Sequence, residues 1–294
     1  MIISALSISC EEILKLIDVS DPYYALENLV CEPDGTVSAK VPIQQNLFYE
    51  PSPISSSEGG RHLAVLGSCA CALSNPNKIK HYYLAASANA TRKDFNFNRK
   101  EIPYFIGTAR CLKVDNRTAQ ASTVLKYPDG DVFSEVVINY HVLDYRLFER
   151  IHHEKIIAEA GAGAKHNPYV IEPPVNFTQI SDKQLFGVIE NIKVQDCAGH
   201  FSRIAAIPIS ILFRVLVKLS IILMQQRVGN KNAVFCVREC TTEAKNLAFP
   251  GEEIDVNARF IHTDEKNQHF VKVSAYTNCD CCVGTTELIL VEVK

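Results

Sequence analysis

Residues 196–224 read DCAGHFSRIAAIPISILFRVLVKLSIILM, so Gly-His-Phe precedes a proline and then a long apolar run. The run predicts a helix covered by protein on most sides, because a helix that is apolar all round is a buried one. Pro208 suits its first turn, where no backbone donor is needed. The run is long enough to cross a membrane, but it contains Arg214 and Lys218 on one helix face. Charges inside a membrane are costly, so we expect no membrane span.

The composition is that of a globular protein. The chain has 294 residues, 47% hydrophobic residues and a net charge of −3. This length suits one large domain or two ordinary ones, and the charge does not favour nucleic-acid binding. Eleven cysteines, with no signal-peptide pattern at the start, indicate a reduced, cytoplasmic protein. The cysteines near the end lack short Cys-x2-Cys pairs, so we predict no metal site.

The sequence repeats one plan twice. Residues 55–73, SSSEGGRHLAVLGSCACAL, form a second candidate helix with apolar faces, and residues 181–192 are predicted as a shorter helix. Segments with β-branched and aromatic residues in partial alternation follow each long helix, as expected for strands: 81–91, 104–114, 119–127 and 131–144 in the first part, and 233–246, 253–264, 269–278 and 283–293 in the second. An antiparallel sheet that curls around one helix would bury it almost completely. We therefore predict an α+β fold with repeats at 1–149 and 175–294, joined by a linker at 150–174.

Both repeats resemble the bacterial 3-hydroxyacyl-[acyl carrier protein] dehydratases. The second matches at Gly199-His200-Phe201, at Pro208 and in its last strands, while residues 10–30 are similar to the family's opening helix and first strand. The resemblance implies a fused double hot-dog fold, with the sheets joined edge to edge and the two helices side by side. It implies a monomeric pseudo-dimer, or a dimer of it, acting on thioesters of acyl carrier protein or coenzyme A. No cofactor is implied beyond the phosphopantetheine that carries the substrate.

The resemblance also implies a partial active site. His200 matches the family's catalytic base, but Arg214 stands where the family has its acid, and the first repeat has Val65 at that position. Glu58, at the start of the first long helix, is the candidate for a displaced acid. The remaining predictions are substrate contacts at Gly199, Phe201, Pro208, Gly60, Val65 and Cys69, and carrier contacts at Arg61 and Arg203.

Three functions remain open at this point. The first is a dehydratase-like lyase of fatty acid or polyketide biosynthesis, with a neutral histidine as base and a carboxyl group as acid. The second is thioester hydrolysis or acyl transfer, with His200, Ser68, Cys69 or Cys71 carrying the chemistry. The third is a non-catalytic acyl-binding partner subunit. The resemblance favours the dehydratase, and the missing helix carboxylate argues against a standard one.

Overall fold

The computed structural model describes residues 10–45, 49–95, 102–157 and 167–293. The start of the first predicted repeat (1–9) and much of the predicted linker (158–166) therefore lie outside the described residues. The first part of the chain forms α1 (Cys10–Ile17), β1 (Glu27–Cys31), β2 (Val37–Pro42), α2 (Ser56–Ser74), β3 (His81–Arg92), β4 (Tyr104–Val114), β5 (Thr118–Lys126), β6 (Val132–Asp144) and α3 (Tyr145–Ile151). The second forms β7 (Val175–Ser181), β8 (Gln184–Ile189), α4 (Ile209–Arg227), β9 (Val234–Ala244), β10 (Ile254–Thr263), β11 (Gln268–Thr277) and β12 (Cys282–Val293).

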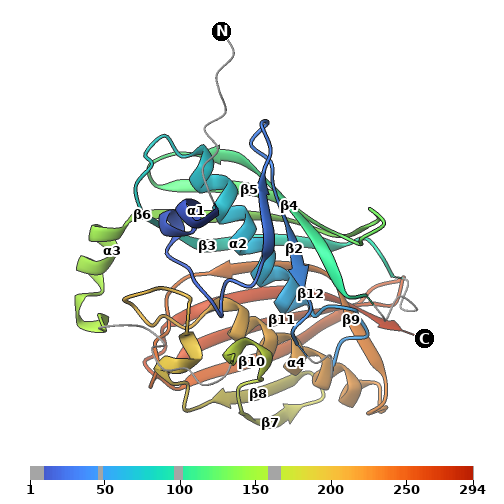
Figure 1. The fold of residues 1–294 in the computed structure, drawn as a ribbon. Helices are drawn as coiled ribbons and strands as arrows, with labels where there is room; N and C mark the ends of the chain where they lie inside the picture. The colour runs from blue at the N-terminus through green and yellow to red at the C-terminus, as the bar shows by residue number, and fades with distance from the viewer. Residues whose placement is uncertain (1–9, 46–48, 96–101, 158–166, 294) are drawn as a thin grey trace.

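The described strands form one antiparallel sheet in the order β1-β2-β4-β5-β6-β3-β9-β12-β11-β10-β8-β7. Strands β3 and β9 join its two parts edge to edge, with Ser87 opposite Glu243 and Thr91 opposite Glu239. Figure 1 shows α2 against the strands of the first part and α4 against those of the second. This is the predicted double hot-dog fold. Because the sheet is continuous, the domain boundaries at 149/150 and 174/175 stay predictions.

Helix α2 is held close to the sheet by its capping and by a glycine. Ser55 is the N-cap, and its side chain accepts a hydrogen bond from the backbone N–H of Glu58. Such a cap is a preferred way to satisfy the free donors of a first turn. A Cβ on Gly67 would meet the hydroxyl of Tyr140 and the side chain of Ala121. The absence of a side chain at position 67 therefore lets α2 approach β5 and β6.

Helix α4 begins after Pro208, which is its N-cap residue. It is long and apolar enough to cross a membrane by length and composition. In the structure it packs on β8, β9, β10 and β11, and Val215, Leu219 and Leu223 on it are fully buried. The predicted buried helix is therefore confirmed as a core element of the second part.

The helix predicted for residues 181–192 is wrong. This stretch contains the end of β7, a turn at Asp182 and Lys183, and strand β8. Burial alternates along β8, with Leu185 and Ile189 fully buried, which is the period of a strand whose one face packs on a core. Gly187 fits between Val175 and Val256 of the neighbouring strands. The turn leaves only short strand segments in this stretch, and they are too short to separate a period of two from one of 3.6.

Candidate functional site

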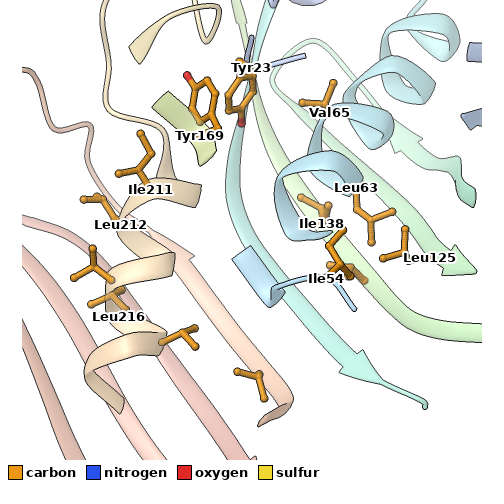
Figure 2. Close-up of a cluster of buried hydrophobic side chains, with 14 of the residues drawn as sticks. Tyr23, Ile54, Leu63, Val65, Leu125, Ile138, Tyr169, Ile211, Leu212 and Leu216 are labelled. Carbon is orange, nitrogen blue, oxygen red and sulfur yellow. The ribbon is translucent and has the colours of Figure 1, made fainter. Parts of the chain in front are cut away.

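A cavity of about 210 Å³ lies between the two parts of the molecule. The N-terminal portions of α2 and α4, strands β3, β6 and β9, and His200 and Phe201 contribute to its lining. Figure 2 shows α2 and α4 with buried apolar side chains, among them Val65 on α2 and Leu212 on α4, which both line the cavity. The volume exceeds the ~150 Å³ of an apolar cavity that holds benzene. The cavity can therefore hold a short or medium acyl chain.

His200 lies at this cavity as a neutral ring. Its Nδ1 is 2.9 Å from the carbonyl oxygen of Ala206; because a carbonyl only accepts, Nδ1 carries the hydrogen and donates it. Burial lowers the pKa of His200 to about 4, so the ring is uncharged at neutral pH. Its Nε2 is then an acceptor, and it has no hydrogen-bond partner among the described residues.

The loop that carries His200 is fixed by one backbone conformation and two hydrogen bonds. Gly199 has φ of +77°, a conformation that glycine adopts without strain. The carbonyl of Gly199 accepts a hydrogen bond from the backbone N–H of Ser20 at 2.9 Å. The hydroxyl of Tyr169 donates to the carbonyl of Ala198 at 2.8 Å. Gly199 sets the backbone before His200. It is not among the described residues that line the cavity, so its substrate contact stays a prediction.

Tyr23 links His200 to the first part of the chain. Its ring centre is 4.7 Å from that of His200 and 5.2 Å from that of Tyr169. Burial raises the pKa of Tyr23 to about 12, against the opposing effect of the Arg61 charge, so the hydroxyl stays protonated. In Figure 2 this hydroxyl points toward the space between α2 and α4, whereas that of Tyr169 points away. Tyr23 is thus a donor at the cavity.

Arg61 lies inside the molecule, with 2% of the residue exposed. Its Nη2 donates to the Oε1 of Gln44 at 2.5 Å, and its guanidinium carbon is 4.8 Å from the ring centre of Tyr169. Its Nε and Nη1 have no hydrogen-bond partner in the described part of the chain. Burial lowers the pKa of Arg61, while the Glu58 charge favours the charged form. Arg61 lines the cavity, so it cannot contact a carrier protein's surface as predicted.

Glu58 is fully buried, and it does not appear among the described residues that line the cavity. Its carboxylate accepts hydrogen bonds from the backbone N–H groups of Gln44 at 2.6 Å and Gln45 at 3.2 Å. Its nearest histidine contact is with Nε2 of His62 at 3.8 Å, one helical turn along α2. The carboxylate therefore fastens the segment before α2. The proposed pairing of Glu58 with His200 has no support from these contacts.

The cavity brings together some of the other predicted residues. Gly60, Val65 and Phe201 line it with His200. Pro208 and Cys69 are not among the described lining residues, and Cys69 is fully buried. Arg203 lies on the surface, 2.8 Å from a carboxylate oxygen of Glu149.

The alternative nucleophiles have little reactivity in this structure. Ser68 lines the cavity, but its hydroxyl donates to the carbonyl of Val65 at 2.7 Å. Cys71 is fully buried, and the pKa of its thiol is raised by a hydrogen bond with Cys111 and by burial. A thiol with a raised pKa is a poor nucleophile, because the thiolate is the reactive form.

Sequence reasoning missed Tyr23 and the buried position of Arg61. Tyr23 follows Asp-Pro in a segment with no clear periodicity, so nothing in the sequence placed it beside His200, 177 positions later. Arg61 lies on a helix whose faces are almost all apolar; that pattern was a signal that a charge there would be buried. Among the described lining residues there are three arginines and one histidine, and no carboxylate.

Comparison with solved structures shows that this fold is shared with several proteins named as thioesterases. No family model matches the sequence, and no curated protein matches it. Solved structures that share the fold include a tesB protein from Mycobacterium avium subsp. paratuberculosis (9% identity, 91% of this chain and 96% of the other, TM-score 0.58). Others are the acyl-CoA thioesterase II TesB2 from Mycobacterium marinum (9%, 97% and 98%, 0.56) and an acyl-ACP thioesterase from Bacteroides thetaiotaomicron (11%, 89% and 100%, 0.51).

The prediction of a dehydratase, and with it the lyase class, is wrong. Two of the named structures, which share the fold over nearly the whole chain, are named as thioesterases, and they match the stated alternative instead. The cavity gives a physical reason. Removal of water from a 3-hydroxyacyl group needs an acid to protonate the leaving hydroxyl, and the described lining holds no carboxyl group. On α4, Arg214 occupies the position of the family's acid.

Proposed function

We propose that this protein hydrolyses acyl thioesters, with the acyl chain in the cavity between α2 and α4 and the thioester beside His200. One observation carries the proposal: at an apolar cavity without a described carboxylate, the acceptor Nε2 of a neutral His200 has no partner among the described residues. The thioester class follows the named neighbours, which are acyl-CoA and acyl-ACP thioesterases. The carrier is coenzyme A or acyl carrier protein, which present the same phosphopantetheine thiol.

Hydrolysis needs an activated water, a donor to the carbonyl oxygen and a proton for the thiol. In the proposal, Nε2 of His200 accepts a proton from water as its oxygen bonds to the thioester carbon. The C–S bond then breaks, and the proton passes to the sulfur, giving a carboxylic acid and a thiol. The bond from Nδ1 to Ala206 holds the ring in the tautomer that this role requires.

The hydroxyl of Tyr23 is the proposed donor to the carbonyl oxygen as negative charge builds on it. It stays protonated, because burial raises its pKa to about 12. The low pKa of His200, about 4, makes the ring a weak base, since a base works best when its pKa lies near the operating pH. We therefore expect slow turnover with a plateau of activity above about pH 6.

The test is release of free thiol from octanoyl coenzyme A and from octanoyl acyl carrier protein. His200→Gln should lower the rate by about 10²–10⁴-fold, and Tyr23→Phe by about a hundredfold. His62→Gln is the control, because burial lowers the pKa of His62 to about 4, as it does for His200, but His62 is fully buried and is not among the described lining residues. Circular dichroism confirms that each variant is folded.

Two results would contradict the proposal. The first is a folded wild-type protein that releases no thiol from either substrate, which points to an acyl-binding partner. The second is thiol release that survives His200→Gln, which places the chemistry on another group.

A further inference from the structure

We propose that the cavity is also a binding site for free carboxylates, the anions of medium-chain fatty acids, with the carboxylate held at Arg61 and Tyr23. The proposal goes beyond hydrolysis, because a carboxylate can bind there whether or not the chain cleaves a thioester. Its first support is the charge of the lining. The arginines at 61, 92 and 238 line the cavity, and the described lining contributes no negative side chain.

Arg61 is the cation in this lining that lacks a counter-ion. It is 2% exposed and forms no ion pair with any described residue. The charge of Glu58 has the largest favourable effect on the charged form of Arg61, but both carboxylate oxygens of Glu58 already accept backbone hydrogen bonds, from Gln44 and Gln45. A buried cation without a paired anion is unfavourable. An anionic ligand in the cavity would supply the counter-ion for Arg61.

Tyr23 adds a neutral donor at the same end of the cavity. The guanidinium carbon of Arg61 is 6.0 Å from the centre of the Tyr23 ring, and the Tyr23 hydroxyl points toward the space between α2 and α4 (Figure 2). This hydroxyl has no hydrogen-bond partner in the part of the chain that is described. A carboxylate only accepts hydrogen bonds, so a hydroxyl and a cation together are a matched recognition pair for it.

The rest of the lining fits a hydrocarbon tail. Leu63 and Val65 on α2 and Leu212 and Phe213 on α4 all line the cavity, and the first three are almost fully buried. An apolar cavity with a few convergent polar groups is the common form of a small-molecule site. The arrangement therefore selects an amphiphile with an apolar chain and one anionic oxygen group.

The test compares octanoate with octanol by titration calorimetry on the full-length protein. The two ligands share a chain length and differ in charge. We expect octanoate to bind the wild-type protein at least about tenfold more tightly, as a charge-assisted contact is stronger than a neutral one. Arg61→Met should remove this preference while octanol still binds. Tyr23→Phe should reduce it severalfold.

Arg203→Met is the matched control, because Arg203 is an exposed arginine paired with Glu149 and is not among the described lining residues; its preference should equal that of the wild type. Arg238→Met tests a second arginine of the lining. Equal binding of octanoate and octanol by the wild type would overturn the proposal. So would a preference that survives Arg61→Met or that disappears in Arg238→Met instead.

The inference stays testable if Arg61→Met does not fold. The wild-type comparison alone decides whether a carboxylate is preferred, and Tyr23→Phe then tests where it binds, because an unchanged preference in that variant overturns the assignment. The result is also separable from hydrolysis. Selective octanoate binding without thiol release would leave the carboxylate site standing and remove the thioesterase, while thiol release without selective binding would do the reverse.

Discussion

At the scale of single residues, the backbone at Gly199 decides where His200 lies. A Cβ at Gly199 would clash with the backbone oxygens of Ser20 and Asp21, and its φ of +77° disfavours other residues. Gly35 has a similar φ of +82° with nothing within 4 Å of such a Cβ. A comparison of Gly35 with Gly199 therefore separates the cost of backbone strain from the cost of a steric clash.

The prediction is a large difference between two alanine variants. Gly35→Ala should cost about 1–2 kcal/mol in the free energy of unfolding, the cost of the left-handed region alone. Gly199→Ala should cost clearly more and should also impair thiol release, because the loop must move. Urea denaturation measures both. Equal losses for the two variants would mean that the contact at Ser20 is not formed.

Buried neutral histidines make stability depend on pH. The pKa values of His200 and His62 are both lowered to about 4 by burial, from 6.5. Between these values the unfolded chain binds more protons, so the free energy of unfolding is fully present above about pH 6.5 and falls as the pH drops toward 4. Buried Glu50 has a raised pKa and acts in the opposite direction.

The expected outcome is a loss on the order of 1–3 kcal/mol per histidine across that window. Urea denaturation at a series of pH values measures it. His200→Gln and His62→Gln should each flatten the acid side of the curve relative to the wild type, which isolates the histidines from Glu50. A curve for either variant that runs parallel to that of the wild type would show that its imidazole is not buried neutral.

At the scale of elements, the two long helices were predictable and one short element was not. The apolar run before Met224 and the small-residue segment before Leu73 are long enough for their patterns to indicate buried helices, and both appear as α4 and α2. Residues 181–192 contain a hairpin turn at Asp182 and Lys183. Two short strands around such a turn offer too little periodicity to exclude a helix.

The packing of α2 gives a prediction with an internal control. Gly67→Ala should destabilise the protein by about 1–3 kcal/mol, because the added methyl group meets Tyr140 and overpacking has about this cost. Gly60→Ala, in the same helix with nothing within 4 Å, should be neutral or stabilise by up to about 1 kcal/mol. Thermal unfolding measures both. A stabilising Gly67→Ala would show that α2 stands further from β6.

At the scale of the whole molecule, one sheet and one core join the two repeats. Strands β3 and β9 pair along five residues each, and a single cluster of buried side chains includes Val65 from the first part and Leu216 from the second. We therefore expect one cooperative unfolding transition. Far-ultraviolet circular dichroism and tyrosine fluorescence should give the same midpoint in urea. Two separate midpoints would mean that the repeats fold independently.

The sequence predicted the architecture better than the site. Repeated patterns of helix and strands carry the fold, and Gly-His-Phe led to His200, which does line the cavity. The groups around His200 come from segments that are remote in the sequence. Tyr23 precedes β1, and Tyr169 lies in the predicted linker at 150–174. Such contacts depend on how the two parts dock, which local patterns do not encode. For the same reason the sequence did not show that the carboxylate of Glu58, the predicted acid, accepts hydrogen bonds from the backbone N–H groups of Gln44 and Gln45.

The most direct test of the thioesterase proposal is hydrolysis of octanoyl coenzyme A in water enriched with heavy oxygen, followed by mass spectrometry of the products. The account predicts octanoate that carries a heavy oxygen atom, together with free coenzyme A, in amounts that collapse in His200→Gln but not in His62→Gln. Unlabelled octanoate, an acyl group moved to another acceptor, or no product from the folded wild-type protein would contradict it.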